Sequence, residues 1–130
     1  MVRIFGSLLL AGLVLWTSIA SASQVKHLDA LQAQQLLRDP SIFLLDVRTP
    51  MEFGQARLDG ANLIPIDQFL KREREVPKNR PILIYCAVGS RSNQVARYLA
   101  QRGYPQVYNL YGGIVSWQRQ GLPVLRGPGG

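Results

Sequence analysis

Short apolar runs alternate with amphipathic segments along most of this chain. Runs such as Ile82-Leu83-Ile84 are apolar at every position, which is typical of strands in a sheet that is covered on both faces. The predicted strands are 42–45, 62–66, 81–85 and 106–110, and the predicted helices are 30–38, 67–75, 90–102 and one that begins after Gly112-Gly113. This alternation predicts an α/β domain with a mainly parallel central sheet flanked by helices on both faces.

Residues that start and stop helices support these boundaries. Asp29 precedes the first helical segment and is predicted to be its N-cap, and Asp67 is predicted to cap the charged helix that Pro77 ends. Gly103 follows the 90–102 segment, where a glycine commonly ends a helix.

The first 22 residues have the pattern of a secretory signal peptide. Arg3 precedes an apolar stretch at 4–19, and Ala20-Ser21-Ala22 forms a small-x-small cleavage signal. We expect cleavage after Ala22, a periplasmic or secreted protein and no stable membrane association afterwards; an uncleaved N-terminal anchor is the alternative. The remaining chain is then one domain, residues 23–125, and a tail, 126–130, which has no apolar residue and is predicted to be disordered.

The charge of the chain is basic but dispersed. The formal net charge is +7, and cleavage would remove Arg3 and no acidic residue. The densest charged segment, residues 71–75, mixes both signs at helical spacing and is typical of a solvated helix face. No basic block or aromatic stripe appears, so we expect no nucleic-acid partner, and the positive field would instead attract small anions.

The only cysteine of the chain, Cys86, follows a predicted strand and precedes a predicted helix. A glycine, Gly89, and an arginine, Arg91, lie in the same loop. Backbone N–H groups at a helix N-terminus and a nearby guanidinium both stabilise a thiolate, which is the nucleophilic form of cysteine. We interpret this loop as an anion-binding nucleophile site, against the alternative of a buried cysteine that ends a core strand.

A second charged segment leaves the strand 42–45. It contains Asp46, Arg48 and Glu52, and the carboxyl ends of parallel strands are where sites form in such sheets. These side chains are expected to converge with the Cys86 loop into a catalytic pocket. A structural ion pair between Asp46 and Arg48 that stabilises the turn is an equal alternative.

Other chemistry is not indicated by the sequence. A lone cysteine excludes an internal disulfide, and His27, the only histidine, lies far in sequence from the loop. No metal-ligand cluster, phosphate-binding glycine motif or nucleotide fingerprint is present, so we predict no cofactor and no metal.

Four motifs in order resemble those of the rhodanese family in its single-domain form. They are Leu44 to Phe53, Gly60 to Pro65, the Cys86-x-x-Gly89-x-Arg91 loop, and Gly112 to Trp117 followed by Gly121-Leu122-Pro123-Val124. One departure is visible, because the family often has Gly-His-Ile-Pro where this chain reads Ala56-Arg57-Leu58-Asp59. Arg57 is expected to lie at the surface or to add to a positive rim of the pocket.

The resemblance implies a sulfurtransferase that works through a Cys86 persulfide. A small anionic sulfur donor such as thiosulfate would load the thiolate, and a thiol or cyanide, or a partner sulfur-acceptor protein, would remove the sulfur. Cys86 would be catalytic, the loop would bind substrate, and Asp46 and Arg48 would support it. The loop residues are Ala87, Val88, Gly89, Ser90 and Arg91.

Two other functions remain open from the sequence. A cysteine-dependent phosphatase or arsenate reductase uses a similar loop, but its loop has one residue more than the four between Cys86 and Arg91. A non-catalytic rhodanese-like binding module is the other, although such modules typically lose the cysteine. The physiological donor and acceptor and the oligomeric state are not encoded in any motif.

Overall fold

The computed structural model describes residues 2, 12–17 and 24–128. Five parallel strands form one sheet in the order β1-β5-β4-β2-β3. The strands are β1 Val25–Leu28, β2 Phe43–Asp46, β3 Asn62–Leu63, β4 Ile82–Tyr85 and β5 Val107–Leu110. The predicted parallel sheet is confirmed. β1 was not predicted, because this edge strand exposes its two middle residues, Lys26 and His27, and has no continuous apolar run.

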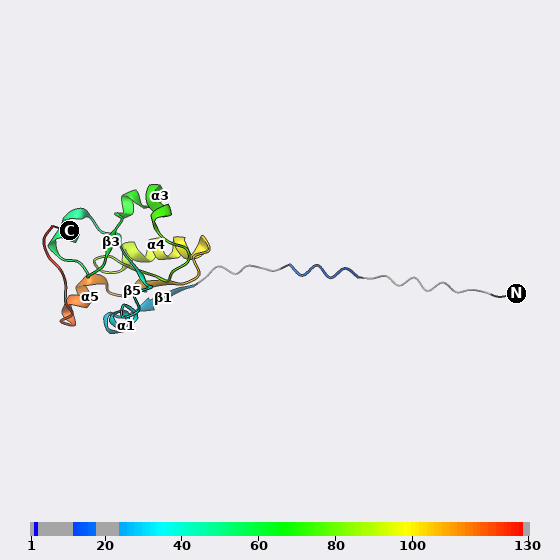
Figure 1. Cartoon of the computed structure of the whole chain (residues 1–130), viewed down its shortest axis with the longest axis horizontal. Coiled ribbons are helices and arrows are strands. Elements are labelled where there is room, and N and C mark those ends of the chain that lie inside the picture. Colours follow the sequence, from blue (N-terminus) through cyan, green and yellow to red (C-terminus); the bar gives the residue numbers. More distant parts are fainter. Residues whose placement is uncertain (1, 3–11, 18–23, 129–130) are drawn as a thin grey trace.

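Helices cover both faces of the sheet, as predicted (Figure 1). α1 and α5 pack together on one face, and α4 lies on the other with α3 beside it, where Phe69 meets the ring of Tyr98 edge to face. The helices are α1 Ala30–Leu36, α2 Pro50–Gln55, α3 Phe69–Arg72, α4 Ser90–Gln101 and α5 Gly113–Arg119.

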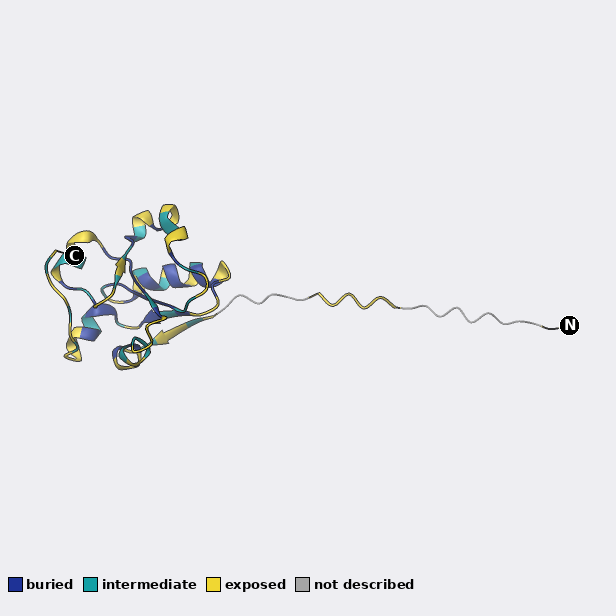
Figure 2. Cartoon of the chain, viewed as in Figure 1, coloured by how far each residue is buried: buried dark blue, intermediate teal, exposed yellow. Residues whose placement is uncertain are grey.

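Alternate residues of the central strands supply two separate cores. Ile82 and Ile84 of β4 pack in the cluster that includes α4, whereas Leu83 and Tyr85 pack in the cluster that includes α1 and α5. Every residue of β4 is fully buried. Figure 2 shows this buried layer along the sheet and on the side of α4 that faces it. The sheet therefore fixes the carboxyl end of β4, where Cys86 begins its loop, from both sides.

Asp29 is the N-cap of α1, as predicted. Its Oδ1 accepts a hydrogen bond from the Gln32 amide at 2.8 Å, and the Gln32 side chain accepts one from the Asp29 amide at 3.0 Å. Gly103, at φ +88°, follows α4 as predicted, and the amide of Tyr104 donates back to the Leu99 carbonyl.

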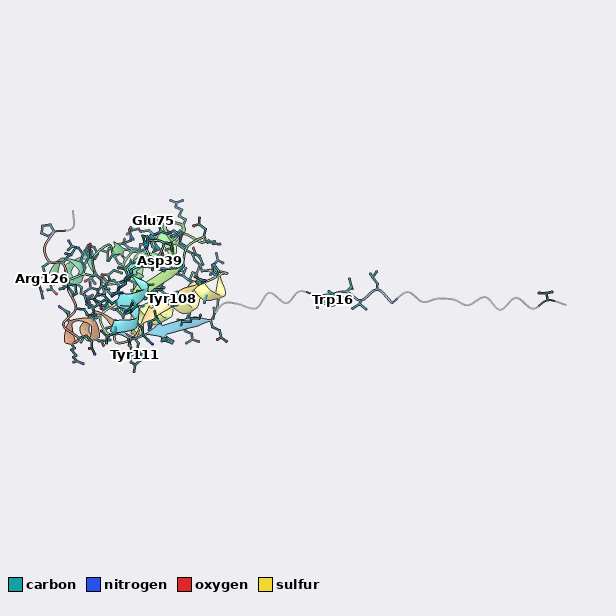
Figure 3. All side chains as sticks on the ribbon, turned by 60° about the horizontal axis from the view of Figure 1, so that its bottom comes forward. Trp16, Asp39, Glu75, Tyr108, Tyr111 and Arg126 are labelled. Carbon is teal, nitrogen blue, oxygen red and sulfur yellow. The ribbon has the colours of Figure 1, made fainter. Side chains whose placement is uncertain are left out.

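The predicted helix over 67–75 and its Asp67 cap are wrong. This segment breaks into a 3₁₀ turn at Ile66–Gln68, the short α3 and a second 3₁₀ turn at Glu73–Glu75, and Asp67 lies inside the first turn without capping it. Arg72 pairs with Glu75 at 2.7 Å on the surface, and Glu75 points outward in Figure 3.

The last described residues are attached to α2. Leu125 pairs with Arg57 in a two-way backbone bridge, and the amide of Gly127 donates to the Gly54 carbonyl at 2.8 Å. Arg126 Nη1 donates to the Gln55 carbonyl at 3.1 Å. The sequence predicted a disordered tail over 126–130, but these bonds tie Arg126 and Gly127 to the domain, and residues 129–130 lie outside the described part.

Arg57 is the residue that holds this tail. It is half-buried, its Nη1 donates to the Gly127 carbonyl at 2.7 Å, and its guanidinium lies 4.8 Å from the centre of the Phe53 ring. Arg57 is thus a partly exposed residue that binds backbone carbonyls, and it does not line the hollow beside Arg91.

Most of the predicted signal peptide, residues 1–22, lies outside the described residues. Residues 12–17 form no helix or strand and are exposed, including Leu13, Val14, Leu15 and Trp16. Among the residues described, no helix combines the length and the apolar character needed to cross a membrane.

Candidate active site

The loop from β4 to α4 is wrapped around the Cys86 sulfur. Gly89 adopts φ +104°, a left-handed conformation that favours glycine, and it is the N-cap residue of α4. This turn directs the Gly89 amide to Cys86 Sγ at 3.1 Å. A glycine is thus favoured at this position, because the left-handed conformation orients the Gly89 amide toward the sulfur.

A second donor comes from the first turn of α4. Ser92 Oγ lies 3.3 Å from Cys86 Sγ and 3.2 Å from the Gly89 carbonyl, so its single proton has two acceptors. Burial raises the pKa of the Cys86 thiol, but hydrogen bonds from Ser92 and from the amides of Gly89 and Val88 outweigh burial, and the net pKa is lowered. The site therefore favours the thiolate, as the sequence predicted.

Helix α5 supports the loop from behind. The amides of Ile114 and Val115, in its first turn, donate to the carbonyls of Cys86 and Ala87 at 3.0 and 3.1 Å. Gly113 has φ +60°, and a Cβ there would lie 2.6 Å from the Cys86 carbonyl oxygen and overlap the carbonyl of Ala87. The helix N-terminus thus binds loop carbonyls, which leaves loop amides to face the sulfur.

A buried amide from β5 also approaches the loop. Asn109 is 2% exposed, and its Nδ2 lies 3.5 Å from the Gly89 carbonyl and 3.3 Å from His27 Nδ1. His27 was predicted to have no role in the site, and it reaches the loop only through this amide. The three residues form a chain of contacts that runs from the edge strand β1 to the loop.

Arg91, predicted as a loop residue, lies in the first turn of α4 and pairs with Glu52 of α2. Its two terminal nitrogens donate to the two carboxylate oxygens at 2.8 and 2.9 Å, and both side chains are about 30% exposed. The hydrogen bonds from Arg91 lower the pKa of Glu52 to about 2, and the same pairing raises the pKa of Arg91. Both groups therefore stay charged in the physiological pH range, and this bidentate pair ties the loop to α2.

Asp46 and Arg48 form a buried structural ion pair. Arg48 Nη2 lies 2.7 Å from Asp46 Oδ2, and the Arg48 guanidinium also donates to the Ala56 carbonyl. Their residues are 0% and 3% exposed, and Arg48 lies 5.3 Å from the centre of the Tyr85 ring. The alternative of a structural pair is the one that the geometry favours, and neither side chain contacts the Cys86 loop through a hydrogen bond.

Two hollows flank helix α4. One, of about 300 Å³, lies beside Arg91 between the loop after β2 and the segment that follows β3. The other, of about 600 Å³, lies at the junction of β1 and α4 and contains no residue of the loop 86–91. The smaller hollow is the one that shares a residue with the nucleophile loop.

The remaining predicted loop residues differ in exposure. Val88 is 61% exposed and Ser90 is also exposed, whereas Ala87 is half-buried with its carbonyl held by α5. Within the described ranges, no three His, Cys, Asp or Glu side chains come together as a metal site would need.

Sequence reasoning missed three contributors to the site: Ser92, Asn109 and the backing role of Gly113. Ser92 was visible as a second serine in the Gly89-Ser90-Arg91-Ser92 turn, one helical turn after the glycine. Asn109 was visible as a polar residue in an apolar strand. Only the fold brings Gly113 against the loop, because the two are distant in sequence.

Comparison with known proteins assigns this fold and loop to a family. The model of the rhodanese-like domain matches residues 29–120. The chain therefore belongs to the rhodanese-like domain family.

Individual relatives agree with this assignment. The chain is 41% identical to a protein named sulfurtransferase from Allochromatium vinosum, over 78% of this chain and 95% of that protein. It is 35% identical to the thiosulfate sulfurtransferase GlpE from Tolumonas auensis, over 74% of this chain and 91% of that protein. Its fold is similar to that of a rhodanese-related protein from Thermoplasma volcanium, with a TM-score of 0.71, 26% identity and coverage of 77% and 97%.

Proposed function

We propose that this protein is a rhodanese-type sulfurtransferase that carries sulfur as a Cys86 persulfide. The observation that supports it most directly is the geometry at Sγ, where the Gly89 amide at 3.1 Å and the Ser92 hydroxyl at 3.3 Å converge on one sulfur. These donors lower the pKa of the thiol despite its burial. The sulfurtransferase names of the relatives support the same reaction class.

The reaction is two successive displacements at sulfur. The Cys86 thiolate attacks the outer sulfur of thiosulfate or a related donor, the bond from that sulfur to the sulfite group breaks, and sulfite leaves with the electron pair. A thiolate or cyanide then attacks the outer sulfur of the persulfide, and the Cys86 thiolate is released. No oxidant or reductant is consumed, because each step exchanges one bond to sulfur for another.

The loop stabilises the charge that moves onto the sulfur. Its amides and the Ser92 hydroxyl are fixed before the reaction by α4 and α5, so they need no reorganisation when the thiolate or persulfide forms. Cys86 itself is fully buried. Val88 and Ser90 are the exposed parts of the loop.

The persulfide is tested by intact mass. After incubation with thiosulfate or polysulfide, the protein should gain the mass of one sulfur atom and lose it on addition of cyanide, with formation of thiocyanate. Cys86→Ser serves as the matched control and should gain nothing. Failure of the parent protein to gain sulfur from either donor would contradict the proposal, and hydrolysis of a phosphate ester by the same sample would favour the phosphatase alternative.

Export is a separate proposal that rests on the sequence of residues 1–22. We propose that the mature protein acts in the periplasm or outside the cell, with sulfur arriving from a small anionic donor and leaving to a thiol, cyanide or a partner sulfur-acceptor protein. The N-terminal residue of the protein isolated from its native cells tests export. A start at Ser23 is expected, and a start at Met1 would contradict it.

A further inference from the structure

The hollow beside Arg91, here called the groove, lies next to the nucleophile. β2 and β4 pair in register with Asp46 opposite Tyr85, and the Val47 amide donates to the Tyr85 carbonyl at 3.2 Å. Val47 and Cys86 directly follow these paired strand ends and belong to the same hydrophobic cluster, so they are neighbours at about the 4.8 Å spacing of adjacent strands. Val47 forms part of the groove wall, so this wall is one strand away from Cys86.

The groove is lined by both apolar and polar residues. Its volume is about 300 Å³, at the lower end of the range for small-ligand sites. Apolar walls of this kind accommodate the carbon chain of a small organic molecule. Its lining residues are Val47, Arg48, Thr49, Pro50, Pro65, Ile66, Asp67, Gln68 and Arg91.

The charges on the groove favour a cation. Arg48 is neutralised by Asp46 at 2.7 Å, and Arg91 is neutralised by Glu52 through two hydrogen bonds. Asp67 is exposed and makes no ion pair within the described part of the chain. Three charged side chains therefore line the groove, and only the negative one has no partner.

We propose that the groove is the acceptor subsite of the sulfur transfer, and that it selects short thiols carrying a cationic amine, whose ammonium group lies against Asp67. This inference rests on the proposed persulfide chemistry. The acceptor thiolate attacks the outer sulfur of the Cys86 persulfide, the sulfur–sulfur bond to Cys86 breaks, and the products are the acceptor persulfide and the Cys86 thiolate. An anionic acceptor would meet Asp67 and two arginines whose charges are already compensated.

The test separates loading from acceptor choice. Cys86 is first loaded with polysulfide, and the added sulfur is verified by intact mass. Single-turnover transfer is then followed with three thiols of the same length: cysteamine, 2-mercaptoethanol and 2-mercaptoethanesulfonate. Each rate is divided by the thiolate concentration and by the rate of the same thiolate with a small-molecule disulfide, so that differences in thiol pKa and in intrinsic nucleophilicity do not enter.

The expected order is cysteamine, then 2-mercaptoethanol, then 2-mercaptoethanesulfonate. One exposed carboxylate should give cysteamine an advantage of about two- to fivefold over the neutral thiol at low salt. Asp67→Asn should remove this advantage, and Asp67→Lys should reverse the order. The matched control is Asp59→Asn, which removes the same charge from an exposed carboxylate outside the groove lining and should keep the order.

The outcomes distinguish the two proposals. If the parent protein does not load, the persulfide function itself fails. If it loads and transfers to all three thiols at equal corrected rates, or if Asp67→Asn keeps the cysteamine advantage, the acceptor subsite is overturned. If Asp59→Asn changes the ratio as much as Asp67→Asn does, the preference comes from the overall field of the protein and the groove assignment is also overturned.

Discussion

The ends of β2 and β4 occupy the same edge of the sheet, but they hold charge in opposite ways. At the last residue of β2, the carboxylate of Asp46 is fully buried and pairs with Arg48, which donates hydrogen bonds to it. Beyond β4, the Cys86 sulfur is also fully buried, but its donors are the amides of the loop and one hydroxyl, and the nearest guanidinium in the loop is committed to Glu52. One end is a closed ion pair, and the other is a cradle of neutral donors.

This difference is the physical reason that we propose sulfur chemistry at only one of the two strand ends. The charge of the buried Asp46 carboxylate is already balanced by the Arg48 guanidinium. We therefore expect this pair to stabilise the turn and to take no direct part in sulfur chemistry. Neutral donors around a sulfur stabilise a negative charge without cancelling it, and a thiolate in such a cradle keeps its nucleophilic electron pair.

The largest effect is expected from breaking the closed pair. Arg48→Met leaves the Asp46 carboxylate buried without a counter-ion, which should lower the free energy of unfolding by about 3–5 kcal/mol. Urea denaturation of the purified variant measures it, with Arg72→Met of the exposed Arg72–Glu75 pair as the control, for which we expect a much smaller change. A second variant, Asp46→Leu with Arg48→Met, should recover much of the stability. An Arg48→Met protein as stable as its parent would mean that the pair is not structural.

The second-largest effect is expected on the rate of persulfide formation, when the ion pair between Glu52 of α2 and Arg91 is broken. Glu52→Gln removes the charge that holds Arg91, and the loop then loses its fixed position relative to the sulfur. We expect persulfide formation to slow about tenfold, with little change in stability, because small displacements of reacting groups have large effects on rate. Single-turnover mass spectrometry measures the rate, and Glu75→Gln is the surface control. An unchanged rate would show that Arg91 does not need Glu52 to hold the loop.

A smaller effect is expected from the cradle itself. Ser92→Ala removes one hydrogen bond to Sγ, which should raise the pKa of Cys86. The midpoint of iodoacetamide alkylation should move to higher pH by about 0.5 to 1 pH unit, the equivalent of one hydrogen bond. Ser90→Ala, in the same helical turn but without a bond to the sulfur, should leave the midpoint in place. Equal midpoints for the parent and Ser92→Ala would show that the Ser92 hydroxyl does not stabilise the Cys86 thiolate.

The smallest effect is expected in the acid stability of the half-exposed pair. The pKa of Glu52 is about 2 in the folded protein, below its ordinary value of 4.5, so the pair stabilises the fold above pH 4.5 and loses this contribution as the pH falls toward 2. Solvent screening limits the contribution to less than about 1 kcal/mol. Urea midpoints at pH 6 and pH 3 should differ more in the parent than in Glu52→Gln. Identical differences in both proteins would contradict this role.

The alternation of apolar runs and amphipathic segments was sufficient to predict the parallel sheet and most of its helices. It failed at β1, whose exposed middle residues give no apolar run, since its pairing with β5 comes from the sheet edge. It also missed the short helix α2, Pro50–Gln55, which no predicted helix covered. At 67–75 the charge pattern favoured one helix, but the backbone makes two 3₁₀ turns around α3. These failures fall on short elements whose local pattern is weak or misleading.

The candidate site divides in the same way. Cys86, Gly89 and Arg91 were found because their spacing in one loop carries the chemistry. The partners of these residues come from elsewhere in the chain: Glu52 from α2, Asn109 from β5 and the backing amides from α5. Spacing along a sequence does not show whether two charged neighbours pair with each other or face a pocket, so Asp46 and Arg48 were left between a structural and a substrate-binding role.

The contact between Gly113 and the back of the loop affects how relatives of this protein should be judged. A chain that kept the cysteine, the glycine and the arginine of the loop but carried a larger residue at the position of Gly113 would retain the motif and lose its shape, because a Cβ there overlaps the Ala87 carbonyl. The loop motif of such a chain would suggest sulfurtransferase activity, but we expect the displaced loop to abolish that activity in an assay. The sequence signature of this loop therefore lies in two segments: the cysteine loop itself, and Gly113, where only a hydrogen atom fits in place of a side chain.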